Sequence, residues 1–261
     1  MPKFIFVPQH CYAIITPNTP KEYQGLMTSG LSDCTGVMIS ALDQEGRYAC
    51  LCHADTATVL SDPDEGIPGW IRFLRHEGCV GNIEIRYKLV SWPENPDILP
   101  LSNKLRISAR GVISPIVDDV LRGNVYGKKI LDVVTSLSPD ELTRISIHRD
   151  DDEKKRHMPG LILPRNNMEP VYLRDAESDL SSRFNAEMEF TDFATYWGRV
   201  DQALQDKRIT EYPPLCIFDS THILTLEEMW NRYMQYSASN VIGQALDTVR
   251  RALSPPFSYR T

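Results

Sequence analysis

The chain has 261 residues, of which 42% are hydrophobic and 24% charged, a composition typical of a globular protein that can bury a large core. Its net charge of −7 does not favour nucleic acid or an anionic membrane surface as a partner, since both attract clustered positive charge. No apolar run approaches the roughly 18 residues of a membrane-spanning helix, and the six cysteines are too few for a disulfide framework. We therefore expect no membrane span and a cytosolic, reducing compartment, and a dedicated secretion machine could also deliver the protein into a host cytosol.

Most of the elements predicted in the first 150 residues are strands. The N-terminal segment lacks the apolar region and cleavage site of a secretory signal and is interpreted as the first strand. Alternation and turn residues predict strands over residues 3–8, 10–16, 37–42, 47–53, 82–90, 105–113, 129–134 and 145–148. Helices are predicted over 68–77 and 114–123, with a short one opened by the capping box at 138–141, and a polar connection over 17–25.

The second half of the chain has a less regular pattern. Residues 158–190 show no clear periodicity, a helix is predicted over 193–204 and a buried strand over 215–218. A second capping box at Thr225 opens the longest predicted helix, which extends to about Leu253. These elements indicate an α+β protein in which residues 1–158 form the core. Residues 159–261 form a helical or mixed extension, either separate or part of the same domain.

A hairpin in the first half brings together residues that can perform nucleophilic catalysis. Cys34 precedes the strand over 37–42 and His53 ends the returning strand, so the hairpin can set a thiol beside an imidazole. His53 could take the thiol proton, hold the pair as thiolate and imidazolium, and later protonate the leaving group. Backbone N–H groups of Ser32, Asp33 and Cys34 could form an oxyanion site. Thr28 or Asp55 could orient the imidazole.

The sequence Leu31-Ser32-Asp33-Cys34-Thr35, with Thr28 before it and His53 after it, resembles the catalytic loop of the bacterial glutamine deamidases. These include the cytotoxic necrotizing factor toxins and the Burkholderia lethal factor. The CheD chemotaxis-receptor deamidases are similar in having a threonine six positions before the cysteine, and the protein N-terminal asparagine amidohydrolases in having Cys then His around a hairpin.

The resemblance implies a mixed, largely antiparallel β-sandwich with flanking helices and the catalytic pair at one edge. It implies that Cys34 is the nucleophile, His53 the general base and acid, and Thr28 the orienting group, with Ser32, Asp33 and Thr35 in the catalytic loop. The chain departs from the toxins at Asp33, where they have glycine. A carboxylate pointing inward there would oppose thiolate formation, and a position that needs positive φ tolerates aspartate better than most residues.

These implications predict a hydrolase, a protein deamidase that converts a glutamine or, less readily, an asparagine side chain through a thioester, without metal or organic cofactor. An amine in place of water would give transglutamination. The toxin branch implies a virulence effector whose substrate is a host protein. The alternative is a non-catalytic module on the same scaffold, in which residues 159–261 contact a protein partner and Asp33 marks a decayed site.

Two other interpretations of the hairpin compete with catalysis. The run Cys50-Leu51-Cys52-His53 invites a zinc site, but strand alternation places the two cysteines on one face and His53 on the other. A second ligand pair at short spacing is also missing. In the remaining interpretation His53 is a hydrogen-bonded core histidine, since buried imidazoles often serve structure.

Overall fold

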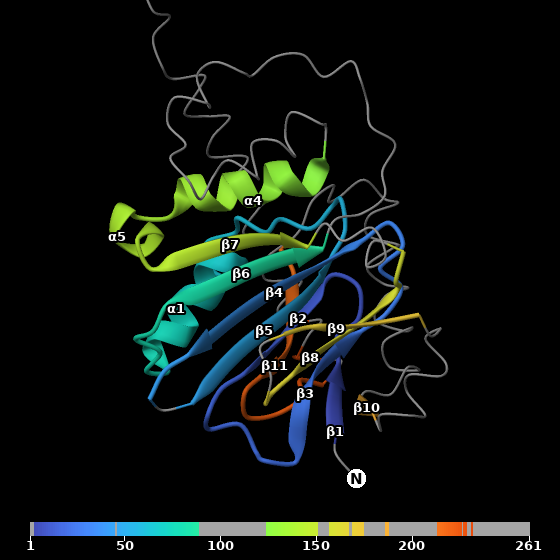
Figure 1. The fold of residues 1–261 in the computed structure, drawn as a ribbon. Helices are drawn as coiled ribbons and strands as arrows, with labels where there is room; N and C mark the ends of the chain where they lie inside the picture. The colour runs from blue at the N-terminus through green and yellow to red at the C-terminus, as the bar shows by residue number, and fades with distance from the viewer. Residues whose placement is uncertain are drawn as a thin grey trace, which may run out of the picture.

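The computed structural model describes residues 3–44, 46–88, 124–150, 157–166, 169–174, 186–187, 213–225, 227–228 and 231. Two mixed β-sheets pack against each other, and helices flank the larger sheet (Figure 1). Of the nine strand pairings in this part of the chain, five are antiparallel. The predicted α+β class, with a mixed and largely antiparallel sandwich, is confirmed.

Each sheet combines strands from both halves of the chain. The smaller sheet has the order β10 (Ala186–Glu187), β1 (Lys3–Phe6), β3 (Tyr23–Thr28), β8 (Gly160–Pro164) and β9 (Val171–Leu173). The larger sheet has the order β11 (Leu215–Asp219), β2 (Cys11–Ile15), β5 (Arg47–Ala54), β4 (Thr35–Leu42), β6 (Ile83–Lys88) and β7 (Ile145–Asp150). Strands β8 to β11, which follow residue 158, are thus built into both sheets.

The hairpin of β4 and β5 forms as the alternation and the turn residues predict. Asp43 and Gly46 exchange two backbone hydrogen bonds at the turn, of 3.0 and 3.3 Å. From there the two strands pair without interruption, up to Gly36 opposite His53 and Thr35 opposite Ala54. This register puts the start of β4 and the end of β5 at the same edge of the sheet.

The helices cover the face of the larger sheet that lies away from the smaller one. Helix α1 (Ile67–His76) coincides within one residue with its prediction, and its Trp70 stacks on Tyr12 of β2 with ring centroids 4.7 Å apart. Tyr12 pairs with Cys52 and shares its face, opposite to that of His53. Helix α4 (Val125–Ser136) contacts α1. Helix α5 (Pro139–Leu142) is capped by Ser138, as predicted.

Three assignments from the sequence are wrong. The strand predicted over 129–134 is part of α4, which Asn124 caps by accepting from the N–H groups of Tyr126 and Gly127. Its buried residues Tyr126, Ile130 and Val134 repeat every four positions, a helical period that a window of six residues conceals. The predicted connection over 17–25 overlaps β3, and the irregular stretch 158–190 contains β8, β9 and β10. These strands are short, and β8 and β10 also pair with strands distant in sequence, β3 and β1.

Several predicted elements lie outside the described residues: the strand over 105–113, the helices over 114–123 and 193–204, and most of the helix after Thr225. The capping box that opens this last helix is present, since the N–H of Glu228 donates to the Thr225 hydroxyl and the Glu228 carboxylate accepts from the Thr225 N–H. None of the helices in the described ranges combines the length and apolar character needed to cross a membrane.

Candidate functional site

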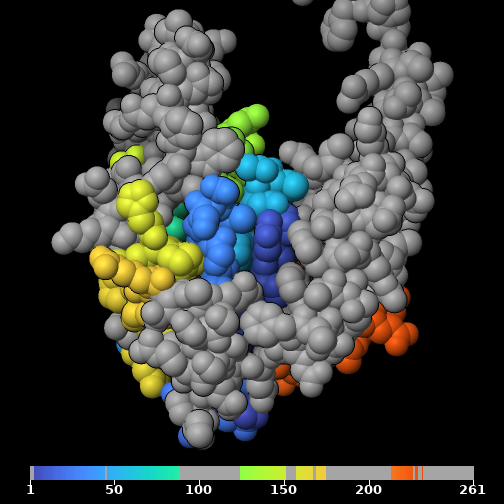
Figure 2. Space-filling model, turned by 90° about the vertical axis from the view of Figure 1, so that its right-hand side faces the viewer, coloured from blue at the N-terminus to red at the C-terminus, as the bar shows by residue number. Residues whose placement is uncertain are grey.

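The candidate site lies where one edge of the larger sheet meets the smaller sheet. Thr28 ends β3, Cys34 immediately precedes β4, and His53 lies one residue before the end of β5. The loop between Thr28 and Thr35 carries the chain from the smaller sheet to the larger one. Figure 2 shows a face of the molecule on which the N-terminal segments (blue), the segment after β5 (cyan) and α4 (green) meet.

Thr28 holds the imidazole of His53 in one tautomer. The Thr28 hydroxyl donates to the carbonyl of Val7 at 2.6 Å and lies 2.8 Å from Nδ1 of His53. A hydroxyl has one proton, and here the Val7 carbonyl takes it, so the hydroxyl must accept from Nδ1–H. The proton of the neutral ring therefore resides on Nδ1, and Nε2 presents its lone pair.

Nε2 of His53 is the chemically distinctive atom of the site. It is fully enclosed, and no described residue makes a hydrogen bond to it. Buried polar atoms are nearly always paired, and an unpaired one has a cost of about 1–3 kcal/mol. A core histidine in a purely structural role would use both of its nitrogens.

Cys34 lies in the bend immediately before β4, two residues before Gly36, which pairs with His53. Continued back by two residues, the alternation of β4 predicts that the Cys34 side chain is on the face of His53. On that face the side chains of Leu31 and Leu161 lie over Gly36. The Cys34 residue is 8% exposed, more than any of the other five cysteines, although its thiol makes no hydrogen bond to Nε2.

The thiol and the imidazole are both neutral at rest. Burial, followed by the charges of Asp55 and Asp33, raises the pKa of Cys34 to about 12, against the opposing effect of Lys88. Burial and the charge of His10 lower the pKa of His53 to about 3. The expected thiolate–imidazolium pair is therefore not the resting state, because neither ion has the solvation that would stabilise it. Proton transfer has to accompany nucleophilic attack.

The side chain of Asp33 does not point inward, the orientation that would oppose thiolate formation. Its side chain is exposed, and its carbonyl accepts a hydrogen bond of 2.8 Å from the Tyr126 hydroxyl of α4. Its φ is not positive, since the left-handed position of this loop falls on Gly30, at φ +78°. Asp33 opposes thiolate formation less than burial and Asp55 do.

Three backbone N–H groups of the loop before β4 could stabilise an oxyanion. Among the described residues, the backbone N–H groups of Ser32, Asp33 and Cys34 have no hydrogen-bond acceptor, whereas the N–H of Leu31 donates to Pro159. The side chain of Thr35 is not part of this set, because it is buried and its hydroxyl donates to the carbonyl of Lys88 at 2.6 Å.

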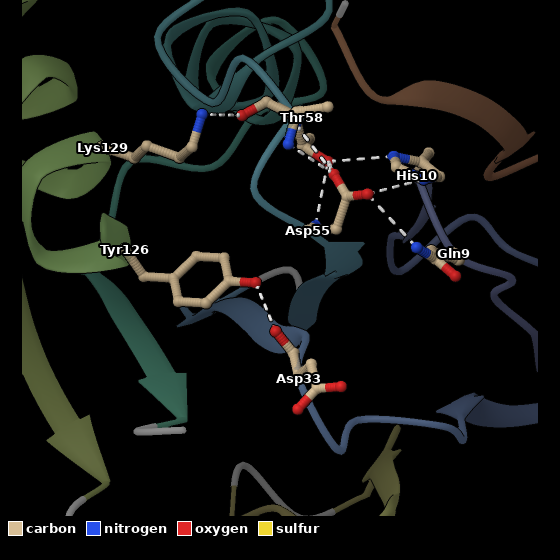
Figure 3. Close-up of polar contacts among 8 residues, drawn as sticks. Gln9, His10, Asp33, Asp55, Thr58, Tyr126 and Lys129 are labelled. Carbon is tan, nitrogen blue, oxygen red and sulfur yellow. Dashed lines mark hydrogen bonds and ion pairs between the residues drawn. The ribbon is translucent and has the colours of Figure 1, made fainter. Parts of the chain in front are cut away.

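Asp55 belongs to a neighbouring polar cluster with Gln9, His10 and Thr58 (Figure 3). It makes no hydrogen bond to the imidazole of His53, on which it acts through its charge. Its carboxylate accepts from Nε2 of His10 at 2.9 Å and from the backbone N–H groups of Ala57 and Thr58. Burial raises the pKa of Asp55, but the hydrogen bond and charge of His10, together with the hydrogen bonds from Ala57 and Thr58, lower the value to about 2. Of the two candidates for orienting His53, Thr28 is the one in contact.

Two residues near the pair were not singled out by the sequence. His10, at φ 64°, donates its backbone N–H to the carbonyl of His53 at 2.7 Å and so fixes the end of β5. In the strand predicted over 82–90, Lys88 alternates with apolar residues and so belongs to the polar face, yet it has no exposed surface. Alternation assigned Lys88 to the correct face of β6, but the loop before β4 packs over that face at the end of the strand. The periodicity of a strand does not indicate which other segments pack on it.

We expect Gly30→Ala to destabilise the protein by about 1–2 kcal/mol, the cost of an L residue in the left-handed region. The added methyl group would lie 3.8 Å from Cε1 of His53, so the loop cannot relax toward the ring. Urea unfolding measures the change. Ser32→Ala, at an exposed position in the same loop, is the matched control and should leave the unfolding free energy unchanged. Equal stability of the two variants would contradict the prediction.

Comparison of the sequence with models of known protein families finds no match, and comparison with curated proteins finds none either. The geometry of Thr28, Cys34 and His53 is therefore the basis for any assignment. Within the described ranges, no group of three or more His, Cys, Asp or Glu side chains could hold a metal ion.

Proposed function

We propose that this protein is a cysteine-dependent amidohydrolase that deamidates a glutamine side chain, or less readily an asparagine side chain, of a protein substrate. One observation supports this above the others. Nε2 of His53 is buried, unpaired among the described residues and held in the tautomer that accepts a proton, and Cys34, the most exposed cysteine of the chain, immediately precedes the strand that pairs with His53. The motif resemblance to bacterial toxins supports a host protein as the substrate.

In the first half of the reaction, Sγ of Cys34 attacks the carbon of the side-chain amide while its proton passes to Nε2 of His53. The negative charge that develops on the amide oxygen can be stabilised by the free N–H groups of Ser32, Asp33 and Cys34. The imidazolium then protonates the nitrogen, the C–N bond breaks, and ammonia leaves a thioester. Thr28 keeps accepting from Nδ1–H throughout, so the ring does not change its orientation.

In the second half, Nε2 takes a proton from water as the water oxygen attacks the thioester carbon. The C–S bond breaks, the imidazolium returns its proton to sulfur, and the substrate is left with a carboxylic acid in place of its amide. A primary amine that attacks instead of water would give a substituted amide, with the same residues in the same roles. The site contains nothing that excludes this transglutamination.

A non-catalytic binding module is the second candidate, and one observation favours it. Sγ of Cys34 makes no hydrogen bond to Nε2, and burial raises the pKa of the thiol instead of lowering it. A decayed site would have these properties. An active site would have them only if a substrate draws the thiol toward Nε2, as catalytic hydrogen bonds in empty sites often close on binding.

The test is peptide mapping by mass spectrometry of a host-cell lysate after incubation with the wild-type protein, Cys34→Ser or Cys79→Ser. We expect conversion of a particular amide to a carboxylate with the wild type and Cys79→Ser only. Cys79→Ser is a suitable control because Nη1 of Arg75 lies 3.9 Å from this sulfur and can donate to a serine hydroxyl. Added primary amine distinguishes transglutamination. If Cys34→Ser modifies the same peptides, or no peptide changes, the proposal fails.

A further inference from the structure

Lys88 is a buried cation attached to the loop that carries the nucleophile. It has no exposed surface, and its Nζ donates to the carbonyl of Leu31 at 3.0 Å. Its own carbonyl accepts from the hydroxyl of Thr35 at 2.6 Å. Lys88 thus contacts the chain on both sides of Cys34, three residues before it and one residue after it.

The charge of this lysine is not neutralised by a carboxylate in the described part of the chain. Among the described residues its Nζ bonds only to the neutral Leu31 carbonyl, although an ammonium group has three donors. A buried charge without an ionic partner is costly, so a protein that needed only a tie to Leu31 would be served better by a neutral amide. The cost suggests that the charge itself has a use.

The strand register places Lys88 in line with the site. Val37 pairs with Tyr87 on one side of β4, and Gly36 pairs with His53 on the other, so Lys88, Gly36 and His53 form one row across the sheet. Side chains in such a row share a face. Over the glycine in the middle of the row lie the side chains of Leu161 and of Leu31, which belongs to the loop that carries Cys34 and accepts from Lys88.

We propose that Lys88 is a positioning residue whose ammonium group, held beside the loop of Cys34, stabilises the negative charge that forms on the sulfur when the thiol loses its proton. The neutral resting pair makes this useful, because charge appears only during attack and a fixed cation requires no rearrangement to meet it. The electrostatics agree, because the charge of Lys88 lowers the pKa of Cys34 against burial, Asp55 and Asp33. The proposal rests on the proposed function only in taking Cys34 as the nucleophile.

The test compares the rate at which neutral iodoacetamide alkylates Cys34 in the wild type, Lys88→Gln, Lys88→Met and Lys128→Gln. Glutamine keeps a donor for Leu31 without the charge, methionine removes both, and Lys128 is an exposed control on α4. At a pH of about 7 we expect both Lys88 variants to react at least about tenfold more slowly than the wild type, because an opposite charge near an ionisable group shifts its pKa by about 1–3 units. Lys128→Gln should react like the wild type. A wild-type rate in Lys88→Gln would overturn the proposal and leave Lys88 as a tie for the loop.

The wild-type protein offers a second measurement, which stands even if the variants do not fold. Burial lowers the pKa of Lys88 to about 8. The logarithm of the alkylation rate should therefore rise with pH below about 8 and become shallower above it, as the ammonium loses its charge. The other charges acting on the thiol are the carboxylates of Asp55 and Asp33, and the pKa of Asp55 is lowered to about 2, far below this range. A rise of constant slope through this range in the wild type would overturn the proposal. No substrate is used in either measurement, so a failure of amide hydrolysis is distinguishable from a failure of this inference.

Discussion

His53→Asn is expected to lower deamidation by about a hundredfold to ten-thousandfold, the usual contribution of a general base, while the protein remains folded. The Nδ2 group of asparagine can take the place of Nδ1–H and donate to the Thr28 hydroxyl, now 2.8 Å from the ring. It cannot replace Nε2, which accepts the proton. The rate of amide conversion in the mapped peptide, measured at equal protein concentration, gives the change directly.

Two variants of Thr28 serve as matched controls for this result. Thr28→Ser keeps a hydroxyl that can donate to Val7 and accept from Nδ1–H, and it should retain most of the activity. Thr28→Val leaves both groups unpaired and frees the ring to change its tautomer, with a loss of about 1–3 kcal/mol in stability for each buried unpaired group. If His53→Asn retained the activity of Thr28→Ser, His53 would not be the base.

The stability of the wild-type protein should fall steeply between pH 6.5 and about 3, and His53→Asn should remove this dependence. The folded state holds the pKa of His53 at about 3, below the ordinary 6.5, because its imidazole is buried. Between these pH values His53 binds a proton in the unfolded chain but not in the folded protein. Stability is therefore complete above pH 6.5 and declines on acidification by about 1.4 kcal/mol per pH unit, on the order of 5 kcal/mol in all.

Urea unfolding at several pH values in the upper part of this window measures the slope for the wild type and His53→Asn. Asp55 does not interfere there, because its lowered pKa of about 2 confines its loss of stability to the region below its ordinary value of 3.8. Parallel slopes in the two proteins would show that His53 is solvated in solution, in contradiction to the enclosed Nε2 atom. The proposal that His53 acts as a buried general base would then also fail.

Local patterns in the sequence account for the frame of the site. Asp43 and Gly46 mark the turn of the hairpin, and strict alternation on both sides of it predicts that His53 and Cys34 share one face. The capping serine at position 138 and the apolar side of α1 are similarly local. Such features are predictable because residues close in sequence create them, through backbone geometry and hydrogen bonds that need no distant partner.

The charged and polar surroundings of the pair depended on contacts between segments far apart in sequence. Thr28 meets His53 only because β3 and β5 belong to sheets that pack together. Strand β3 was missed because its partner β8 is distant in sequence and lies in the stretch without clear periodicity. The neutral resting state likewise results from burial, which a list of residues does not contain.

The sequence by itself determined the hairpin and the α+β class, since alternation and turn chemistry act within a few residues. Only the tertiary structure decided that Nε2 of His53 has no partner among the described residues, that Asp55 binds His10 instead, and that Lys88 is buried beneath the loop. The physical reason is that desolvation and charge pairing depend on what packs over a strand, and the covering loop and sheet come from other parts of the chain.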